Sequence, residues 1–228
     1  MSVQPSTGVF HASLPIALPP ARGGPQPSLG IHYSSAAGIR DAGIGWGLEM
    51  PAIERRGPSG GAPSYRDPKP RDPGLYPYWK IEPETRDTRF AFNGEPLVPI
   101  CEVGSVVPCT AADGGVMPEW ADTGWFYFRL ENEGSFSRFF WSPDRQTWRV
   151  QLKGGDILEF GRARVLPSAT ASSIDEEEYA GTDPATGAAA ILRGSFRWNL
   201  VRSFSPGPGG GVPRNVIAYQ WTRLGDTG

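Results

Sequence analysis

Apolar and polar residues alternate over short stretches along most of the chain, and a period of two is typical of β-strands with one buried face. In "SLGIHYSS", for example, Leu29, Ile31 and Tyr33 fall on one face, and "WFYFRLEN" and "FSRFFW" are aromatic-rich runs of strand length. No window of a dozen residues free of Pro and Gly carries apolar residues at helical spacing. The pattern predicts an all-β fold of mainly antiparallel strands and hairpins, with little helix.

The clearest hairpin is "QTWRVQLKGGDILEFGR", and its hydrophobic pattern decides the register. A two-residue Gly-Gly loop would place Val150 opposite Glu159, whereas a three-residue loop at 153–155 places Val150 opposite Leu158. The longer loop keeps apolar residues on one face and puts Gly155 at the left-handed position of a bulged turn. We therefore expect the three-residue loop.

Gly- and Pro-rich stretches separate the other strands. "SFRWNLVRSF" and "RNVIAYQWTR" are expected to pair across the loop "SPGPGGGVP". A proline-rich insertion at 57–88 and an acidic stretch at 168–190 are expected to be irregular loops. Pro15 and Pro19 lie in "SLPIALPP" and indicate an edge strand or an extended lead-in, because proline cannot donate to a strand ladder.

The stretch "GIGWGLEMPAIERR" places Gly43, Gly45 and Gly47 around Trp46. Glycine is unfavourable inside regular elements, so this density predicts a backbone corner that turns Trp46 inward and leads into the strand "AIERR". At least one of Gly45 and Gly47 is expected to have a positive φ. A phosphate-binding glycine loop is the alternative, but such a loop requires a helix directly after it. Pro51 and the strand pattern that follows argue against a helix there.

Composition and charge exclude several classes of protein. The chain has 228 residues, a formal net charge of -2 and a pI near 5.8, with Lys and Arg scattered, so we expect no nucleic-acid partner. No apolar run is long enough for a membrane helix, and residues 1–21 lack the basic start and apolar core of a Sec signal. We therefore expect no membrane insertion by this segment.

Residues that could hold a metal or form a disulfide are few. Cys101 and Cys109 could close a short loop if oxidised, but two reduced, half-buried thiols are the preferred interpretation. With His11 and His32 as the only histidines, no metal-ligand spacing can be assembled from Cys and His. No cofactor or metal site is expected.

Paired carboxylates are the remaining catalytic candidates. Glu131 with Glu133 alternate at a strand end, and Asp175 to Glu178 form an acidic run, so either could be considered for glycoside hydrolysis. The "ENE" that begins at Glu131 also fits the short Glu-x-Glu pattern of ADP-ribosyltransferases. The neighbouring Trp and Arg residues that would fix a sugar are missing, so both groups are interpreted as solvated faces. No Ser/His/Asp or Cys/His arrangement stands out, and we expect no enzyme.

Aromatic residues leave an alternative function open. Trp120, Trp125 and Trp141 could serve as stacking platforms in a carbohydrate-binding module or a cell-surface adhesion domain, although burial in a core is the preferred interpretation for most of them.

Three ordered motifs carry a resemblance to a known family. The succession "SLPIALPPARGGPQPSLGIHYSSAAG", "GIGWGLEMPAIERR" and "FAFNGEPLVPI" resembles the amino-terminal domain shared by the SpvB family and the B component of insecticidal toxin (Tc) complexes. Later strand pairs are similar to Rhs/YD-type β repeats. The matching positions are Pro15, Ile16, Pro19, Pro20, Arg22, Gly23, Gly24, Gln26, Pro27, Ser28, Leu29, Tyr33, Ser34, Ser35, Gly45, Trp46, Gly47, Leu48, Pro51, Ile53, Arg55, Gly94, Glu95, Leu97, Val98 and Pro99.

The resemblance implies a role and an organisation. It implies a non-enzymatic, secreted structural segment of a toxin-delivery protein, part of a curved β-sheet shell that encloses a toxic polypeptide together with an Rhs-repeat C-type component. It also implies a motif region at 1–104, interrupted at 57–88, followed by an antiparallel hairpin region at 105–228. Because "TRLGDTG" follows a strand directly, we expect a fragment of a longer chain or a need for a partner.

Overall fold

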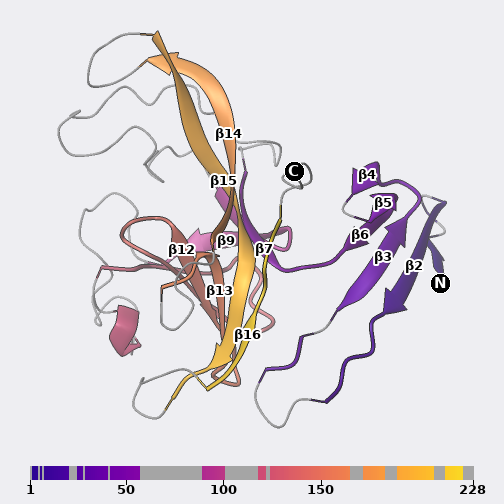
Figure 1. Ribbon diagram of the computed structural model, residues 1–228, viewed down its shortest axis with the longest axis horizontal. Helices are drawn as coiled ribbons and strands as arrows, with labels where there is room; N and C mark the ends of the chain where they lie inside the picture. Colours follow the sequence, from indigo (N-terminus) through magenta and orange to yellow (C-terminus); the bar gives the residue numbers. More distant parts are fainter. Residues whose placement is uncertain are drawn as a thin grey trace. The chain divides into compact units, whose positions relative to one another are not determined.

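The computed structural model describes residues 2–4, 6, 8–20, 25–27, 29–40, 42–56, 89–100, 118–121, 124–164, 172–182, 189–207 and 214–222. Contacts divide the chain into two compact units, Met1–Pro51 and Ala52–Gly228, and both are built of strands (Figure 1). The boundary between the two units falls after Pro51. The division at residue 104 rests on the extent of the sequence motifs and stays a prediction. The all-β fold expected from the alternation is confirmed, and its described helical part is the short 3-10 turn η1 (Glu119–Ala121).

The first unit is a small antiparallel sheet with a separate hairpin beside it. Its strand order is β1-β2-β3-β6. Tyr33 pairs with Ala12 on one side and with Trp46 on the other, so aromatic and small apolar residues share one face. The strands are β1 (Ser2–Gln4), β2 (Val9–Pro15), β3 (Gly30–Ser34) and β6 (Trp46–Leu48), with β4 (Ile39–Arg40) and β5 (Gly43–Ile44) as the hairpin.

Strand β2 corrects one expectation from the sequence. It lies inside the sheet, between β1 and β3, rather than at an edge. Pro15 is its last residue and pairs with Gly30, and the ladder then continues for one bond in which the Ile16 N–H donates to the Leu29 carbonyl at 2.9 Å. The strand therefore ends where its proline stands, which is why proline is tolerated at an interior position.

The second unit is an antiparallel barrel. Strands β7 to β13 pair in chain order, and β15 pairs with both β7 and β13, so eight strands close into a ring among the described residues. Strand β16 pairs with β15 outside this ring, as the sequence predicted for the "SFRWNLVRSF" and "RNVIAYQWTR" pair. The strands are β7 (Ala52–Arg56), β8 (Arg89–Phe92), β9 (Glu95–Pro99), β10 (Phe126–Leu130), β11 (Arg138–Trp141), β12 (Thr147–Gln151), β13 (Ile157–Arg162), β14 (Ser172–Thr182), β15 (Ala189–Ser205) and β16 (Arg214–Ala218).

Large aromatic side chains fill the barrel. The Phe90 ring lies 4.9 Å from Trp141 and 5.0 Å from Trp148, measured between ring centroids, and Trp141 stacks on Trp148 at 5.4 Å. Trp198 packs against the edges of the same rings, and all three tryptophans are buried. A barrel of about eight strands has an interior that side chains can fill. The interior here is therefore a core.

The register of the β12–β13 hairpin confirms the three-residue loop. Val150 pairs with Leu158, and Gly155 has a φ of +92°. The acidic stretch, in contrast, was wrongly expected to be a loop over 168–190. Within the described residues, 172–182 form strand β14, which pairs with β15 from Ile174 to Thr182. Asp and Glu have a low β-propensity, so the sequence of this stretch favours a loop. Pairing with the long strand β15 outweighs that propensity.

Candidate functional site

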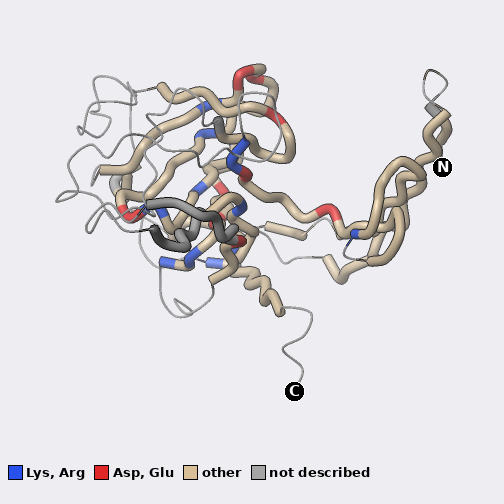
Figure 2. Tube along the Cα trace, turned by 90° about the horizontal axis from the view of Figure 1, so that it is seen from above, with Lys and Arg blue, Asp and Glu red and all other residues tan. Residues whose placement is uncertain are grey.

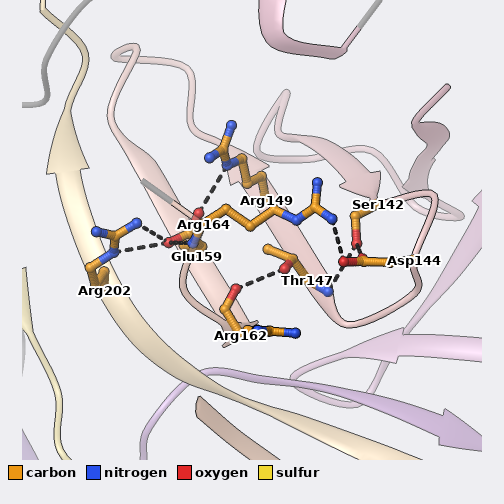
Figure 3. Close-up of polar contacts among 8 residues, drawn as sticks. All are labelled: Ser142, Asp144, Thr147, Arg149, Glu159, Arg162, Arg164 and Arg202. Carbon is orange, nitrogen blue, oxygen red and sulfur yellow. Dashed lines mark hydrogen bonds and ion pairs between the residues drawn. The ribbon is translucent and has the colours of Figure 1, made fainter. Parts of the chain in front are cut away.

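A buried ionic cluster crosses the seam where the barrel closes. Glu159 on β13 accepts a hydrogen bond from Arg149 Nε on β12 at 3.0 Å and from Arg202 Nε on β15 at 2.9 Å (Figure 3). Arg202 Nη2 bonds to the same Glu159 oxygen. The side chains of Arg149, Glu159 and Arg202 are 6%, 0% and 1% exposed, respectively, so this seam cluster is removed from water.

The seam cluster fixes three adjacent strands to one another. Arg149 pairs with Glu159 across β12 and β13, and Glu159 pairs with Arg202 across β13 and β15. A register shift between Glu159 and Phe160 lets Phe160 pair with Leu200, so one residue of β15 is bypassed. This bulge keeps Phe160 and Leu200 in register while Glu159 stays opposite Arg202.

Two tryptophans pack against the seam cluster. The Arg149 guanidinium carbon lies 4.8 Å from the Trp120 ring centroid and 5.2 Å from that of Trp125. The Arg164 guanidinium carbon lies 5.4 Å from the same Trp125 ring. Burial lowers the pKa of Arg149, and the charge and hydrogen bond of Glu159 oppose part of that effect. The Glu159 carboxylate therefore stabilises the charged form of the buried Arg149 side chain.

The turn between β11 and β12 adds a second carboxylate beside the seam. Asp144 accepts a hydrogen bond from Ser142 Oγ at 2.6 Å, and Arg164 pairs with its other oxygen (Figure 3). The Gln146 N–H also donates to Asp144, at 3.2 Å. Burial works to raise the pKa of Asp144, but these hydrogen bonds together hold it below its ordinary value. Thr147 then donates from Oγ1 to the Arg162 carbonyl at 2.7 Å, which ties the turn to β13.

These contacts describe a structural site. Both Glu159 oxygens are bonded to guanidinium groups, so neither is available to take a proton from a substrate. The described residues contain no group of three His, Cys, Asp or Glu side chains suited to a metal ion. The chemistry that this arrangement supports is the locking of β12, β13 and β15.

Sequence reasoning did not single out the seam cluster, although part of the signal was present. The three-residue loop that pairs Val150 with Leu158 also sets Arg149 opposite Glu159, on the other face of the hairpin. Arg202 lies far along the chain, and its pairing depends on closure of the barrel. Periodicity within a single strand does not report such a closure.

The glycine corner predicted from "GIGWG" lies in the first unit. Gly43 has a φ of +114° and Gly45 a φ of +78°, which is the positive φ expected of Gly45 or Gly47. The Trp46 ring lies 5.0 Å from the Tyr33 ring, between centroids, and Tyr33 in turn lies 5.9 Å from Phe10. Trp46 is half-buried rather than fully buried.

Gly45 leaves space that Tyr33 occupies. A Cβ at this position would lie 2.5 Å from Tyr33 Cε2 and 3.0 Å from the Ser34 carbonyl oxygen. Gly47 has no positive φ, but a Cβ there would come within 3.0 Å of Arg40 Cδ. The two glycines therefore have different roles. Gly45 allows a positive φ and the close packing of Tyr33, whereas Gly47 allows only the close packing of Arg40.

We predict that Gly45→Ala loosens the first unit selectively. Positive φ at a residue with a Cβ costs about 1–3 kcal/mol, and the Tyr33 contact adds to it. Gly43→Ala is the matched control, because Gly43 has a positive φ but a Cβ there would meet nothing within 4 Å. Hydrogen exchange of the amides in β3 and β6 should rise more in Gly45→Ala than in the control. Equal exchange in the two variants would show that the Tyr33 contact is unimportant.

Other motif residues lie in turns or at the start of a strand, and some are not among the residues that the structure describes. Gln26 Nε2 donates a hydrogen bond to the Pro19 carbonyl at 3.2 Å. Gly94, with a φ of +90°, follows Asn93 in the turn between β8 and β9. Glu95 then starts β9 and pairs with Phe92. Arg22, Gly23 and Gly24, together with Cys101 and Cys109 and the insertion at 57–88, lie outside the described residues.

Three of the carboxylates considered for catalysis, Glu131, Glu133 and Asp175, have side chains that the structure describes. Glu131 and Glu133 are exposed in the turn between β10 and β11. Both Glu133 oxygens accept hydrogen bonds from Arg129 Nη1 at 2.8 Å, and this contact raises the pKa of Arg129. Asp175 Oδ2 accepts a hydrogen bond from Asn199 Nδ2 at 3.2 Å. None of these groups is brought to a shared site by the fold.

The tryptophans considered as sugar platforms are mostly buried. Trp125 is 2% exposed and Trp141 is 0% exposed, while Trp120 is partly buried against a cluster that includes Trp125 and Phe140. A stacking platform must present its ring to the ligand. The carbohydrate-binding alternative therefore loses the residues on which it rested.

The two histidines lie on the polar face of the first unit. His32 Nε2 lies 3.5 Å from Glu49 Oε2, and His11 lines the same shallow cavity of about 370 Å³ with Arg40 and Tyr33.

Within the described residues, no helical segment has the length and apolar character that crossing a bilayer demands. Figure 2 shows residues of both charge signs along the barrel strands, in place of a single basic stripe.

Together these features define an all-β protein with a small open sheet and a closed antiparallel barrel whose polar site is structural. Residues 4–103, a little under half of the chain, match the family described as Salmonella virulence plasmid 65kDa B protein, or SpvB. This match confirms the resemblance stated from the sequence motifs, and the chain thus carries an amino-terminal segment of the SpvB type. No curated protein matches the chain.

Two solved structures are similar to the chain. The N-terminal domain of effector protein SpvB from Salmonella typhimurium strain LT2 has 21% sequence identity and a TM-score of 0.48, covering 86% of this chain and 51% of that one. TcdB2-TccC3-Cdc42 has 20% identity and a TM-score of 0.49, covering 87% of this chain and 8% of that one. The chain thus spans about half the length of the first structure and a small part of the second.

Proposed function

We propose that this chain is a non-enzymatic wall segment of a secreted toxin-delivery protein of the toxin-complex or Rhs type. The observation that carries the proposal is the SpvB family match over residues 4–103, a range that contains the "PPARGGPQPSL" and "GIGWG" motifs. In this proposal the chain contributes strands to a β-sheet shell that encloses or carries a toxic polypeptide. Its partners are an Rhs-repeat C-type component or the remainder of its own longer chain.

Two features of the barrel support a structural role. Its interior is occupied by buried tryptophan and phenylalanine rings that pack against one another, as in a hydrophobic core. Its buried carboxylate, Glu159, is held by Arg149 and Arg202. Enzymes commonly place reactive carboxylates in a cleft beside a substrate, and this one is locked between strands.

We predict no turnover by the purified chain in assays for glycosidase, NAD-glycohydrolase and ADP-ribosyl transfer activity. The physical reason is that Glu131 and Glu133 lie in an exposed turn, where the Glu133 carboxylate is hydrogen-bonded to Arg129. The matched variant is Glu133→Gln, with Glu95→Gln, at the start of β9, as the control. Turnover that is abolished by Glu133→Gln and kept in Glu95→Gln would overturn the proposal.

A further inference from the structure

The polar face of the first unit carries the shallow cavity of about 370 Å³ already described around the two histidines. Its lining residues come from β1, β2, β3 and β4 and from Glu49, which directly follows β6 (Figure 1). His11 and His32 are the only histidines of the chain, and both line it. A concave surface with a few convergent polar groups is the usual form of a small-ligand site.

Strand register explains why polar groups gather in this cavity. His11 pairs with Ser2 on β1 and with Ser34 on β3, and residues that pair directly share one face of the sheet. His32 pairs with Ser13 in the next row of that face, because residues two apart on a strand point the same way. Two imidazoles and three hydroxyl groups therefore line the same cavity.

Two glycines leave room for the larger side chains of the cavity. A Cβ at Gly47, which pairs with His32, would lie 3.0 Å from Arg40 Cδ, so Arg40 packs over the backbone of β6. A Cβ at Gly30 would lie 3.1 Å from His32 Nε2, so this imidazole packs over β3 in the same way. The close packing at Gly47 therefore places Arg40 over the face of the sheet that carries the histidines.

The charges of the cavity indicate what it can bind. Glu49 Oε2 lies 3.5 Å from His32 Nε2, so the one carboxylate of the lining faces an imidazole. Arg40 is exposed, and its guanidinium forms no hydrogen bond or ion pair within the part of the chain that the structure describes. A guanidinium binds oxyanions through two parallel N–H groups, and histidine and serine side chains can add further donors. The cavity therefore suits an anion with several acceptor oxygens.

We propose that this cavity binds a small soluble ester of phosphate or sulfate, whose oxyanion contacts Arg40, His11 and the hydroxyl groups beside His11. Such an ester presents three terminal oxygens to donors from separate strands, whereas a carboxylate presents two. The volume falls in the range of small-molecule sites, about 300–1,000 Å³, so the cavity can also receive the group that carries the oxyanion. This inference goes beyond the toxin-shell function and does not depend on it, because the barrel contributes no residue to the cavity.

The test uses the full chain and the imidazole signals of its two histidines, which both report on this cavity. Glucose 6-phosphate, glucose 6-sulfate and glucose are titrated at constant pH and ionic strength, and two-dimensional NMR follows the imidazole C–H resonances. At least one of the esters should shift the resonances of His11 and His32, and glucose should leave them unchanged. The absence of a shift with both esters, or an equal shift with glucose, would overturn the proposal.

Two pairs of variants distinguish a built site from general surface charge. Arg40→Gln should weaken binding of the ester about tenfold, whereas Arg214→Gln, which removes the same charge from the exposed strand β16, should change it less than about twofold. Gly47→Ala keeps every charge, but its Cβ would crowd Arg40, so it should also weaken binding. Gly38→Ala is its control, because a Cβ there would meet nothing within 4 Å.

Three results from these variants and from vesicles would contradict the proposal. The first is an equal loss of affinity in Arg40→Gln and Arg214→Gln, and the second is equal affinity in Gly47→Ala and Gly38→Ala. The third is co-sedimentation of the chain with vesicles that contain phosphatidic acid when neither soluble ester binds, because the ligand would then be a lipid surface.

Discussion

Glu159→Gln is expected to lower the free energy of unfolding of the barrel by about 3–5 kcal/mol, because removing one partner of a buried ionic group leaves the others uncompensated. Here the remaining groups are Arg149 and Arg202, both buried at the seam. The substituted glutamine would keep the shape and one acceptor but no charge to balance two guanidinium groups. Urea unfolding followed by tryptophan fluorescence measures the loss, because Trp141, Trp148 and Trp198 are in the barrel core.

The control separates burial from charge. Glu133→Gln removes a carboxylate that is also bound by an arginine but is exposed, and such surface pairs contribute about 0–1 kcal/mol. A triple variant, Arg149→Met with Glu159→Leu and Arg202→Met, replaces the whole cluster by apolar side chains and should be neutral or more stable by about 1–4 kcal/mol. If Glu159→Gln unfolds at the same urea concentration as Glu133→Gln, the seam cluster does not hold the barrel closed.

Gly161→Ala is expected to cost on the order of 4 kcal/mol, from backbone strain and overpacking together. Gly161 has a φ of +76°, and a Cβ there would lie 2.5 Å from Trp198 Cδ1 and would also meet the Gln146 carbonyl oxygen. This position is next to the seam, since Gly161 pairs with Thr147 on one side and with Ser173 on the other. The same urea titration measures the change.

Gly155→Ala is the matched control for Gly161→Ala. Its φ is +92°, but a Cβ there would meet nothing within 4 Å, so it carries the backbone strain of about 1–3 kcal/mol without the collision. The difference between the two variants measures the contact with Trp198 and the Gln146 carbonyl. Variants of equal stability would mean that the barrel can shift at Gly161 without loss.

The sequence predicted those features that depend on neighbours within one hairpin. Alternation and turn residues were enough for the register of Val150 with Leu158, for the glycine corner around Trp46 and for the all-β class. Features set by distant segments were out of reach. The closure of the barrel, the seam pairing of Glu159 with Arg202 and the strand formed by the acidic run all depend on where β15 lies.

Burial was also predicted only in part. Trp125 and Trp141 are buried, as the preferred interpretation held, because the barrel wall has packed layers on both of its faces. Trp46 was expected to be buried and is half-buried, and its described sheet consists of four strands. The alternation of apolar and polar residues predicts on which face of the sheet a side chain lies. Its exposure depends on which other segments cover that face.

Cryo-electron microscopy of the chain together with an Rhs-repeat C-type component tests most directly the proposal that this chain is a wall segment of a toxin-carrying shell. The account predicts one particle in which the barrel unit and the small sheet are continuous with a β-sheet wall around a hollow interior. Two components that migrate separately, or a particle in which this chain lies outside the wall, would contradict it.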